Sequence, residues 1–150
     1  MGDRGNIAVK QQGNSQIWFY AHWSGSKIKD VTKEALAKKW RWDDEAYLAR
    51  IIFDQLTKGR NGEETSFGIS TRILDNEYPI VVVDVPEQRV FTIEETELTK
   101  EGQIPPDFEP DPKRCWSFSA YIGEEPLRQE VRKATRAKTP IQTPAACSTC

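Results

Sequence analysis

Apolar and polar positions alternate along the start of the chain in the way that β-strands require, because a strand turns successive side chains to opposite faces. Residues 6–11 and 16–23 flank the polar residues 12–15, which predicts a β-hairpin. The second of these strands is aromatic on both faces, so it is either covered on both sides or keeps one face for a ligand. One face carries Ile17, Phe19, Ala21 and Trp23, and the other carries Trp18, Tyr20 and His22.

Two helices are predicted next. A thin apolar side on residues 26–39 predicts a surface helix that Ser26 or Asp30 would cap. Residues 44–58 have a broad apolar stripe at helical spacing, which predicts the main helix of the domain. Asp43 or Asp44 would cap this helix, and its stripe consists of Tyr47, Leu48, Ile51, Ile52 and Leu56.

Three more strands are predicted after the main helix. Residues 66–74 alternate, with Phe67 and Ile69 on the face expected to be buried. Residues 80–85 are apolar on both faces and predict a central strand, and residues 89–93 follow a turn. We therefore expect an α+β fold, with an antiparallel sheet of about five strands and one main amphipathic helix packed on it.

The composition of the second half predicts a different organisation. Residues 1–93 form the expected compact domain, and residues 94–114, with many acids and four prolines, predict an extended linker. Residues 115–123 return to apolar character and would dock on the domain. Residues 124–150 predict a basic and largely disordered tail.

The net charge of the chain is small, but the charged residues are unevenly distributed. The formal net charge is −2, which gives no general reason to expect nucleic-acid or membrane binding. Residues 84–111 contain nine acids and two bases, a net −7, whereas residues 112–150 contain seven bases and three acids, a net +4. No apolar run reaches the length of a membrane span, and three cysteines fit a reducing compartment, so we expect a cytoplasmic protein.

Metal and nucleophile chemistry lack the partners they need. Cys147 and Cys150 have the spacing of half a zinc site, and Cys115 with His22 would complete four ligands, but zinc ligands usually come as two close pairs. A nucleophile served by His22 is also disfavoured, because Ser24 lies too close along the strand and no Gly-x-Ser-x-Gly turn exists. We expect no metal and no cofactor.

Carboxylate pairs and glycine loops are weak signals here. The acids at 43–45, 63–64 and 94–95 lie at a helix start, in polar loops or at a strand end, without the apolar surroundings that raise a catalytic pKa. The glycines at 59–62 follow a helix, whereas a phosphate loop leads into one. No catalytic residue is predicted.

Aromatic and arginine residues form the best candidate site. Aromatic faces stack on bases or sugars, and guanidinium groups make paired hydrogen bonds to phosphate. The alternative is that the tryptophans fill a small core and the arginines cover its edge. The predicted ligand-binding residues are Tyr20, His22, Trp23, Trp40, Arg41, Arg50, Thr71, Arg72 and Asn76.

The first ninety residues contain a set of short motifs: Arg4-Gly5-Asn6-Ile7, Tyr20-x-His22-Trp23-x-Gly25, Arg41-Trp42-x-Asp44, Tyr47-Leu48-Ala49-Arg50-Ile51-Ile52-Phe53, Gly68-Ile69-Ser70-Thr71, Asp75-Asn76-Glu77-x-Pro79-Ile80 and Val83-Asp84. Through these motifs the chain resembles a group of small uncharacterised proteins from phages and bacteria. The resemblance implies no catalytic residue, but it implies a binding role, since small phage proteins of this kind include inhibitors of host defence and sponges for cyclic nucleotide signals.

Three functions remain open on the sequence. The leading hypothesis is a non-enzymatic, phage-encoded protein of the host cytoplasm that sequesters a nucleotide-like small molecule, such as a defence signal. The second is an interaction module that inhibits a host or phage enzyme by surface contact, with the acids of residues 84–111 imitating the charge of a nucleic acid. The third is a small hydrolase that depends on His22. Direct nucleic-acid binding and membrane binding are not expected, and an exposed aromatic face would favour a homo-oligomer.

Overall fold

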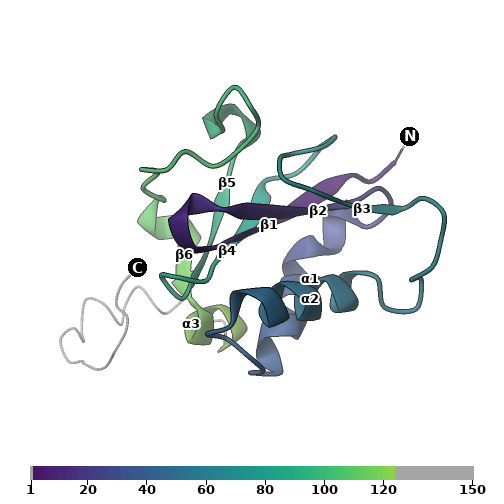
Figure 1. Cartoon of the computed structure of the whole chain (residues 1–150), viewed down its shortest axis with the longest axis horizontal. Coiled ribbons are helices and arrows are strands. Elements are labelled where there is room, and N and C mark those ends of the chain that lie inside the picture. The colour runs from purple at the N-terminus through teal and green to yellow at the C-terminus, as the bar shows by residue number, and fades with distance from the viewer. Residues whose placement is uncertain (1, 124–150) are drawn as a thin grey trace.

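The computed structural model describes residues 2–123, and their central element is a six-stranded sheet (Figure 1). The strands in chain order are β1 (Gly5–Lys10), β2 (Gln16–Ala21), β3 (Phe67–Ser70), β4 (Ile80–Asp84), β5 (Arg89–Ile93) and β6 (Cys115–Ser117). Their order across the sheet is β3-β2-β1-β4-β5-β6. The helices are α1 (Ile28–Ala37), α2 (Glu45–Leu56) and α3 (Phe118–Gly123), with short 3-10 turns η1 (Gln12–Asn14), η2 (Gly25–Lys27), η3 (Glu95–Glu97) and η4 (Pro112–Arg114).

The α+β class is confirmed, but the sheet is mixed and has one strand more than expected. Strand β1 pairs antiparallel with β2 and parallel with β4, while the other neighbours are antiparallel. The parallel pair arises from the path of the chain after the β1–β2 hairpin. The chain passes through both long helices, adds β3 at the edge beside β2, and then crosses to the other side of β1 to form β4. Strand β6 adds the sixth position beside β5.

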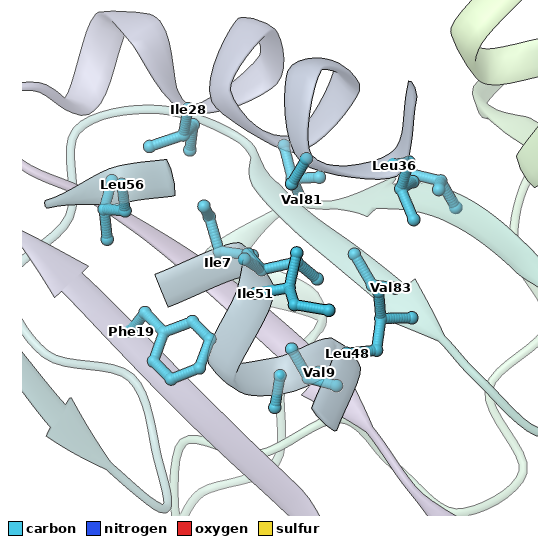
Figure 2. Packing of buried hydrophobic residues seen from close by; sticks show 14 of the residues in the cluster. Ile7, Val9, Phe19, Ile28, Leu36, Leu48, Ile51, Leu56, Val81 and Val83 are labelled. Atoms are coloured by element: carbon cyan, nitrogen blue, oxygen red, sulfur yellow. The ribbon is translucent and has the colours of Figure 1, made fainter. Parts of the chain in front are cut away.

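The helices cover one face of the sheet and enclose the main core (Figures 1 and 2). The predicted N-cap of α2 is present, since the Asp44 carboxylate accepts a hydrogen bond from the Tyr47 amide at 3.1 Å. Four of the five stripe residues are buried, and Tyr47 is the exception at 48% exposed. Figure 2 shows the sheet residues Ile7, Val9, Phe19, Val81 and Val83 packed with Ile28, Leu36, Leu48, Ile51 and Leu56 from the helices.

Helix α1 begins differently from the expectation. Its N-cap position is Lys27, whose side chain makes no capping bond. Ser26 instead turns its hydroxyl toward the N-terminal segment and donates to the Asp3 carboxylate at 2.7 Å. Neither proposed cap therefore holds the helix, which is anchored by burial of Ile28 and Leu36.

The second face of the sheet is covered by residues 94–114, the segment expected to be a linker. Its acids point outward, but Ile104 is buried against Trp18 and Phe91 in a second apolar cluster. The buried Gln16 side chain fixes it in place, accepting from the Ile104 amide at 3.0 Å and donating to the Ile104 carbonyl at 2.9 Å. Leu98, Ile104 and Phe108 hold this segment, because the part of the sheet face that they cover is apolar.

Residues 115–123 continue the same domain. They form β6 and α3, and Phe118 packs under the helices with its ring 5.3 Å from that of Trp42. The predicted strand at 66–74 is shorter, because only Phe67–Ser70 pair with β2. Its position at the sheet edge leaves Ile69 57% exposed rather than buried. The tail predicted for 124–150 lies outside the described residues.

The second cover makes a testable contribution to stability. We expect Ile104→Ala to lower the free energy of unfolding by about 2–5 kcal/mol, because it leaves a cavity between residues 94–114 and the sheet. Ile69→Ala removes the same atoms from an exposed side chain and should cost less than about 1 kcal/mol. Urea unfolding followed by tryptophan fluorescence measures both. Equal losses in the two variants would show that residues 94–114 do not act as a second core layer.

Candidate functional site

A cleft of about 680 Å³ opens on the second face of the sheet, beside the edge strand β3. Trp18 of β2 is completely buried under Ile104, but Tyr20, two residues further along the same face, is only partly covered. The cleft therefore lies where the cover formed by residues 94–114 stops. Its lining consists of Arg4, Tyr20, Arg72, Ile73, Leu74, Asp75, Asn76, Glu77 and Glu95.

Main-chain hydrogen bonds join the cover to the outer wall of the cleft. The Ile73 amide donates to the Gly102 carbonyl at 2.9 Å, and the Gln103 side chain donates to the Thr71 carbonyl at 2.9 Å. Gly102 has a φ of +81°, and a Cβ there would lie 3.0 Å from the Ile73 side chain. A glycine is needed at this position for both its conformation and its close approach.

The loop of residues 74–77 forms the inner wall and is held by the buried side chain of Asn6. The Asn6 amide nitrogen donates to the Asp75 carbonyl at 3.0 Å and to the Asn76 side-chain oxygen at 3.1 Å, while its oxygen accepts from the Leu74 amide at 3.2 Å. The Asn76 amide nitrogen in turn donates to the Tyr78 carbonyl at 2.6 Å. Because these bonds occupy both polar ends of the Asn76 side chain, its main role is to shape the loop.

The N-terminal segment brings Arg4 into the cleft. Asp3 anchors it by accepting hydrogen bonds from the Tyr78 hydroxyl at 2.5 Å and from Ser26, and these donors hold the pKa of Asp3 below its usual range. Gly25 packs directly against this segment, since a Cβ there would lie 2.5 Å from the Arg4 carbonyl carbon. This contact explains the glycine in the His-Trp-x-Gly pattern.

The charges in the cleft are mixed. Arg4 lies 3.5 Å from a carboxylate oxygen of Asp75 and 3.5 Å from one of Glu77, and its buried Nε has no hydrogen-bond partner among residues 2–123. Arg72 is exposed, and its guanidinium forms no ion pair or hydrogen bond with residues 2–123. The cleft thus offers the exposed guanidinium of Arg72, the loosely paired guanidinium of Arg4, and carboxylate acceptors on the loop of residues 74–77.

Tyr20 and His22 form a hydrogen-bonded pair at the floor of the cleft. The Tyr20 hydroxyl oxygen lies 2.6 Å from Nδ1 of His22, which itself does not line the cleft. Burial, followed by the nearby Asp75 charge, raises the pKa of Tyr20, so the phenol keeps its proton at physiological pH. The Trp23 ring contacts the His22 ring edge-on, with 4.4 Å between the ring centroids, and Trp23 is 50% exposed.

The remaining aromatic and arginine candidates lie on the other side of the sheet. Trp40 and Arg50 line a smaller hollow of about 240 Å³ on the helical layer, where Arg50 is paired with Asp54 at 2.6 Å. Arg41 lies over the Tyr47 ring, with 4.7 Å from its guanidinium carbon to the ring centroid. These residues belong to the connection between α1 and α2 and to α2 itself, which pack on the face opposite Tyr20.

The structure thus divides the nine predicted residues. Tyr20, Arg72 and Asn76 line the cleft, and His22 supports it from behind. Thr71 does not line the cleft, although its carbonyl accepts a hydrogen bond from the Gln103 side chain. Trp23, Trp40, Arg41 and Arg50 do not line it either. Sequence reasoning missed the other lining residues, Arg4, Ile73, Leu74, Asp75, Glu77 and Glu95. Local spacing does not indicate that Arg4 meets a loop about seventy positions away, whereas Asp75 and Glu77 are chain neighbours of the predicted Asn76, which was a signal that could have found them.

The zinc site that the sequence left open needs His22 and Cys115 to lie together with Cys147 and Cys150, which are outside the described residues. Residues 2–123 contain no group of three or more histidine, cysteine or acidic side chains placed to hold a metal ion. His22 follows β2 and Cys115 lies on β6, with three strands between, so about 19 Å separates the two proposed zinc ligands.

In the described part of the chain, no helix is long and apolar enough to cross a membrane.

Comparisons with known proteins add no relative. No family model matches the chain, and searches of the curated proteins and of the solved structures returned no match. The roles of the cleft residues therefore follow from their contacts and chemistry in this chain alone.

The control of Asn6 over the cleft wall can be measured. We expect Asn6→Asp to lower the free energy of unfolding by about 1–3 kcal/mol, because the buried donor that serves the Asp75 carbonyl and Asn76 is lost. The same change at exposed Asn61 should be nearly neutral. Urea unfolding gives the stabilities, and amide NMR spectra report on residues 74–77. A neutral Asn6→Asp variant with unchanged loop amides would contradict this role.

Proposed function

We propose that this chain is a non-enzymatic binding protein whose cleft holds a nucleotide-like small molecule. The observation that carries the proposal is the presence, in one cleft, of the Tyr20 phenol, the available Arg72 guanidinium and the carboxylates of Asp75 and Glu77. A nucleotide combines an aromatic ring, hydrogen-bond donors on that ring and an anionic phosphate, and each has a matching group here.

The binding mode follows from where these groups lie. Phosphate meets Arg72 at the rim, and Arg4 provides a second guanidinium when an anion competes with its two long ion pairs. The flat ring packs against Tyr20 and Leu74, and amino groups of a base donate to the carboxylates of the loop. The volume of about 680 Å³ is within the range of small-molecule sites.

A role in sequestration extends the proposal. Asn6 fixes the loop of residues 74–77 before any ligand arrives, so the cleft suits tight holding of a ligand. Together with the resemblance to small phage proteins, this favours a phage protein that removes a nucleotide defence signal from the host cytoplasm.

One observation supports the rival interaction module. The acidic segment is folded onto the sheet, and Glu101, Asp107, Glu109 and Asp111 remain exposed on its outer side. A fixed row of carboxylates is a surface that a basic protein partner would recognise. In that case, charge reversal in this segment abolishes function while changes in the cleft do not.

The cleft hypothesis is tested by binding measurements with paired arginine variants. We expect a cyclic dinucleotide or an ADP-ribose derivative to raise the melting temperature of the wild-type protein. Arg72→Ala should weaken binding of that ligand at least about tenfold, because it removes the charge-assisted hydrogen bonds to phosphate. Calorimetric titration at low and moderate salt provides the dissociation constants.

Arg50→Ala is the matched control. It removes the same charge from a side chain that is exposed and paired with Asp54 outside the cleft, so it should change affinity by less than about twofold. A larger loss in Arg50→Ala than in Arg72→Ala would place the site on the helical layer. Absence of binding by every nucleotide tested would exclude the nucleotide hypothesis.

A further inference from the structure

The chain has a single histidine, and its ring is joined to the one aromatic hydroxyl that lines the cleft. The distance of 2.6 Å between Nδ1 of His22 and the Tyr20 oxygen requires that one of the two donates a proton to the other. Which group donates decides what the Tyr20 hydroxyl offers to a ligand. This makes His22 a residue that acts on the cleft through Tyr20.

A neutral imidazole has one nitrogen that donates and one that accepts. When Nδ1 accepts, the Tyr20 proton is used inside the pair, and only an oxygen lone pair faces the ligand. A phenol with an ordinary pKa of about 10 is a much more acidic donor than the N–H of a neutral imidazole, which favours this arrangement. A protonated imidazole reverses the bond: Nδ1–H donates to the Tyr20 oxygen, and the phenol proton becomes free to turn toward a ligand oxygen.

We propose that His22 sets the specificity of the cleft for anions, because an anion that accepts a hydrogen bond from Tyr20 is bound together with one proton taken up by Nδ1 of His22. The inference rests on the proposed function of the cleft and names one step of its chemistry. The proton comes from solvent, the phenol keeps its own proton, and no covalent bond changes. By linkage, an anion that is bound together with a proton binds more tightly as the pH falls.

Gly2 and Trp23 lie against the His22 ring, and charged residues lie around the pair. The main chain of Gly2 closes over His22, since a Cβ on Gly2 would lie 2.8 Å from Nε2, and the Trp23 ring covers another edge. The charged groups that influence Tyr20 are Asp75, Glu77 and Arg4, and the Asp3 carboxylate is engaged by Tyr78 and Ser26. Arg72 then supplies the fixed positive charge to which the anion is drawn.

The single histidine allows a direct test by NMR. The ring resonances of His22 are followed from about pH 5 to 8.5, the range in which imidazoles change charge. The probe is sulfate, a tetrahedral anion that stays doubly charged over this range, and chloride at equal ionic strength is the reference. We expect sulfate to raise the titration midpoint by about 0.5 pH unit, equivalent to roughly threefold tighter binding to the protonated form.

Two variants separate the hydrogen-bond relay from simple attraction between charges. Tyr20→Phe keeps the ring but removes the hydroxyl, so any sulfate-induced rise of the His22 midpoint that persists in this variant is electrostatic. We expect that rise to be less than half of the rise in the wild-type protein. His22→Asn keeps a polar group near the position of Nδ1 but cannot titrate, and sulfate binding should lose its pH dependence. The Arg72 side-chain resonances report sulfate binding in every variant.

The outcomes distinguish the two levels of the proposal. An unchanged His22 midpoint while sulfate shifts the Arg72 resonances would overturn the relay and leave the cleft intact as an anion site. An equal rise in wild type and Tyr20→Phe would also overturn it. If sulfate moves neither the Arg72 nor the His22 resonances, the relay is wrong, and failure of the nucleotides to bind would then remove the proposed function as well.

Discussion

A sheet that is apolar on both faces must be covered on both faces, and this constraint decides where the rest of the structure lies. Helices α1, α2 and α3 cover one side, and residues 94–114 are the layer that lies on the other (Figure 1). That second layer is thin and is held in place by few buried side chains, of which Ile104 is the most deeply buried. It does not reach the end of β2, so Tyr20 is left at the floor of an open cleft.

The cleft is shaped by polar side chains that join distant parts of the chain. Asn6 on β1 holds residues 74–77, and Asp3 holds the segment that carries Arg4. Buried polar groups without partners cost free energy, so networks of this kind select one loop conformation rather than several. A wall fixed in advance loses less entropy when a ligand binds, which favours recognition of a specific small molecule.

Much of the fold is readable from local patterns. The hairpin, the Asp44 cap with its apolar stripe, and the valine-rich central strand depend on neighbours within a few residues, and the structure contains them. The cover at 94–114 is not readable in this way, because Leu98, Ile104 and Phe108 follow no helical or strand period and gain their burial from the sheet alone. The parallel pairing of β1 with β4 depends on chain topology and leaves no local signal.

The candidate site shows the same limit. The aromatic residues near Tyr20 suggested one cluster, but the connection from α1 to α2 carries Trp40 and Arg41 to the opposite side of the sheet. Arg4 precedes β1, Glu77 precedes β4 and Tyr20 lies on β2. These three residues meet only because β1 lies between β2 and β4 in the sheet. Sequence therefore identified Tyr20 at the floor of the cleft together with Arg72 and Asn76, while the rest of the lining required the three-dimensional structure.

The central claim is that ligands bind where the second layer ends. Hydrogen–deuterium exchange of the full chain, with and without its tightest-binding nucleotide, tests this most directly. We expect slower exchange in residues 72–77 and at the end of β2, and no change in residues 38–58, which include the hollow beside Trp40. Protection confined to residues 38–58 or to the acidic residues 107–111 would contradict the account.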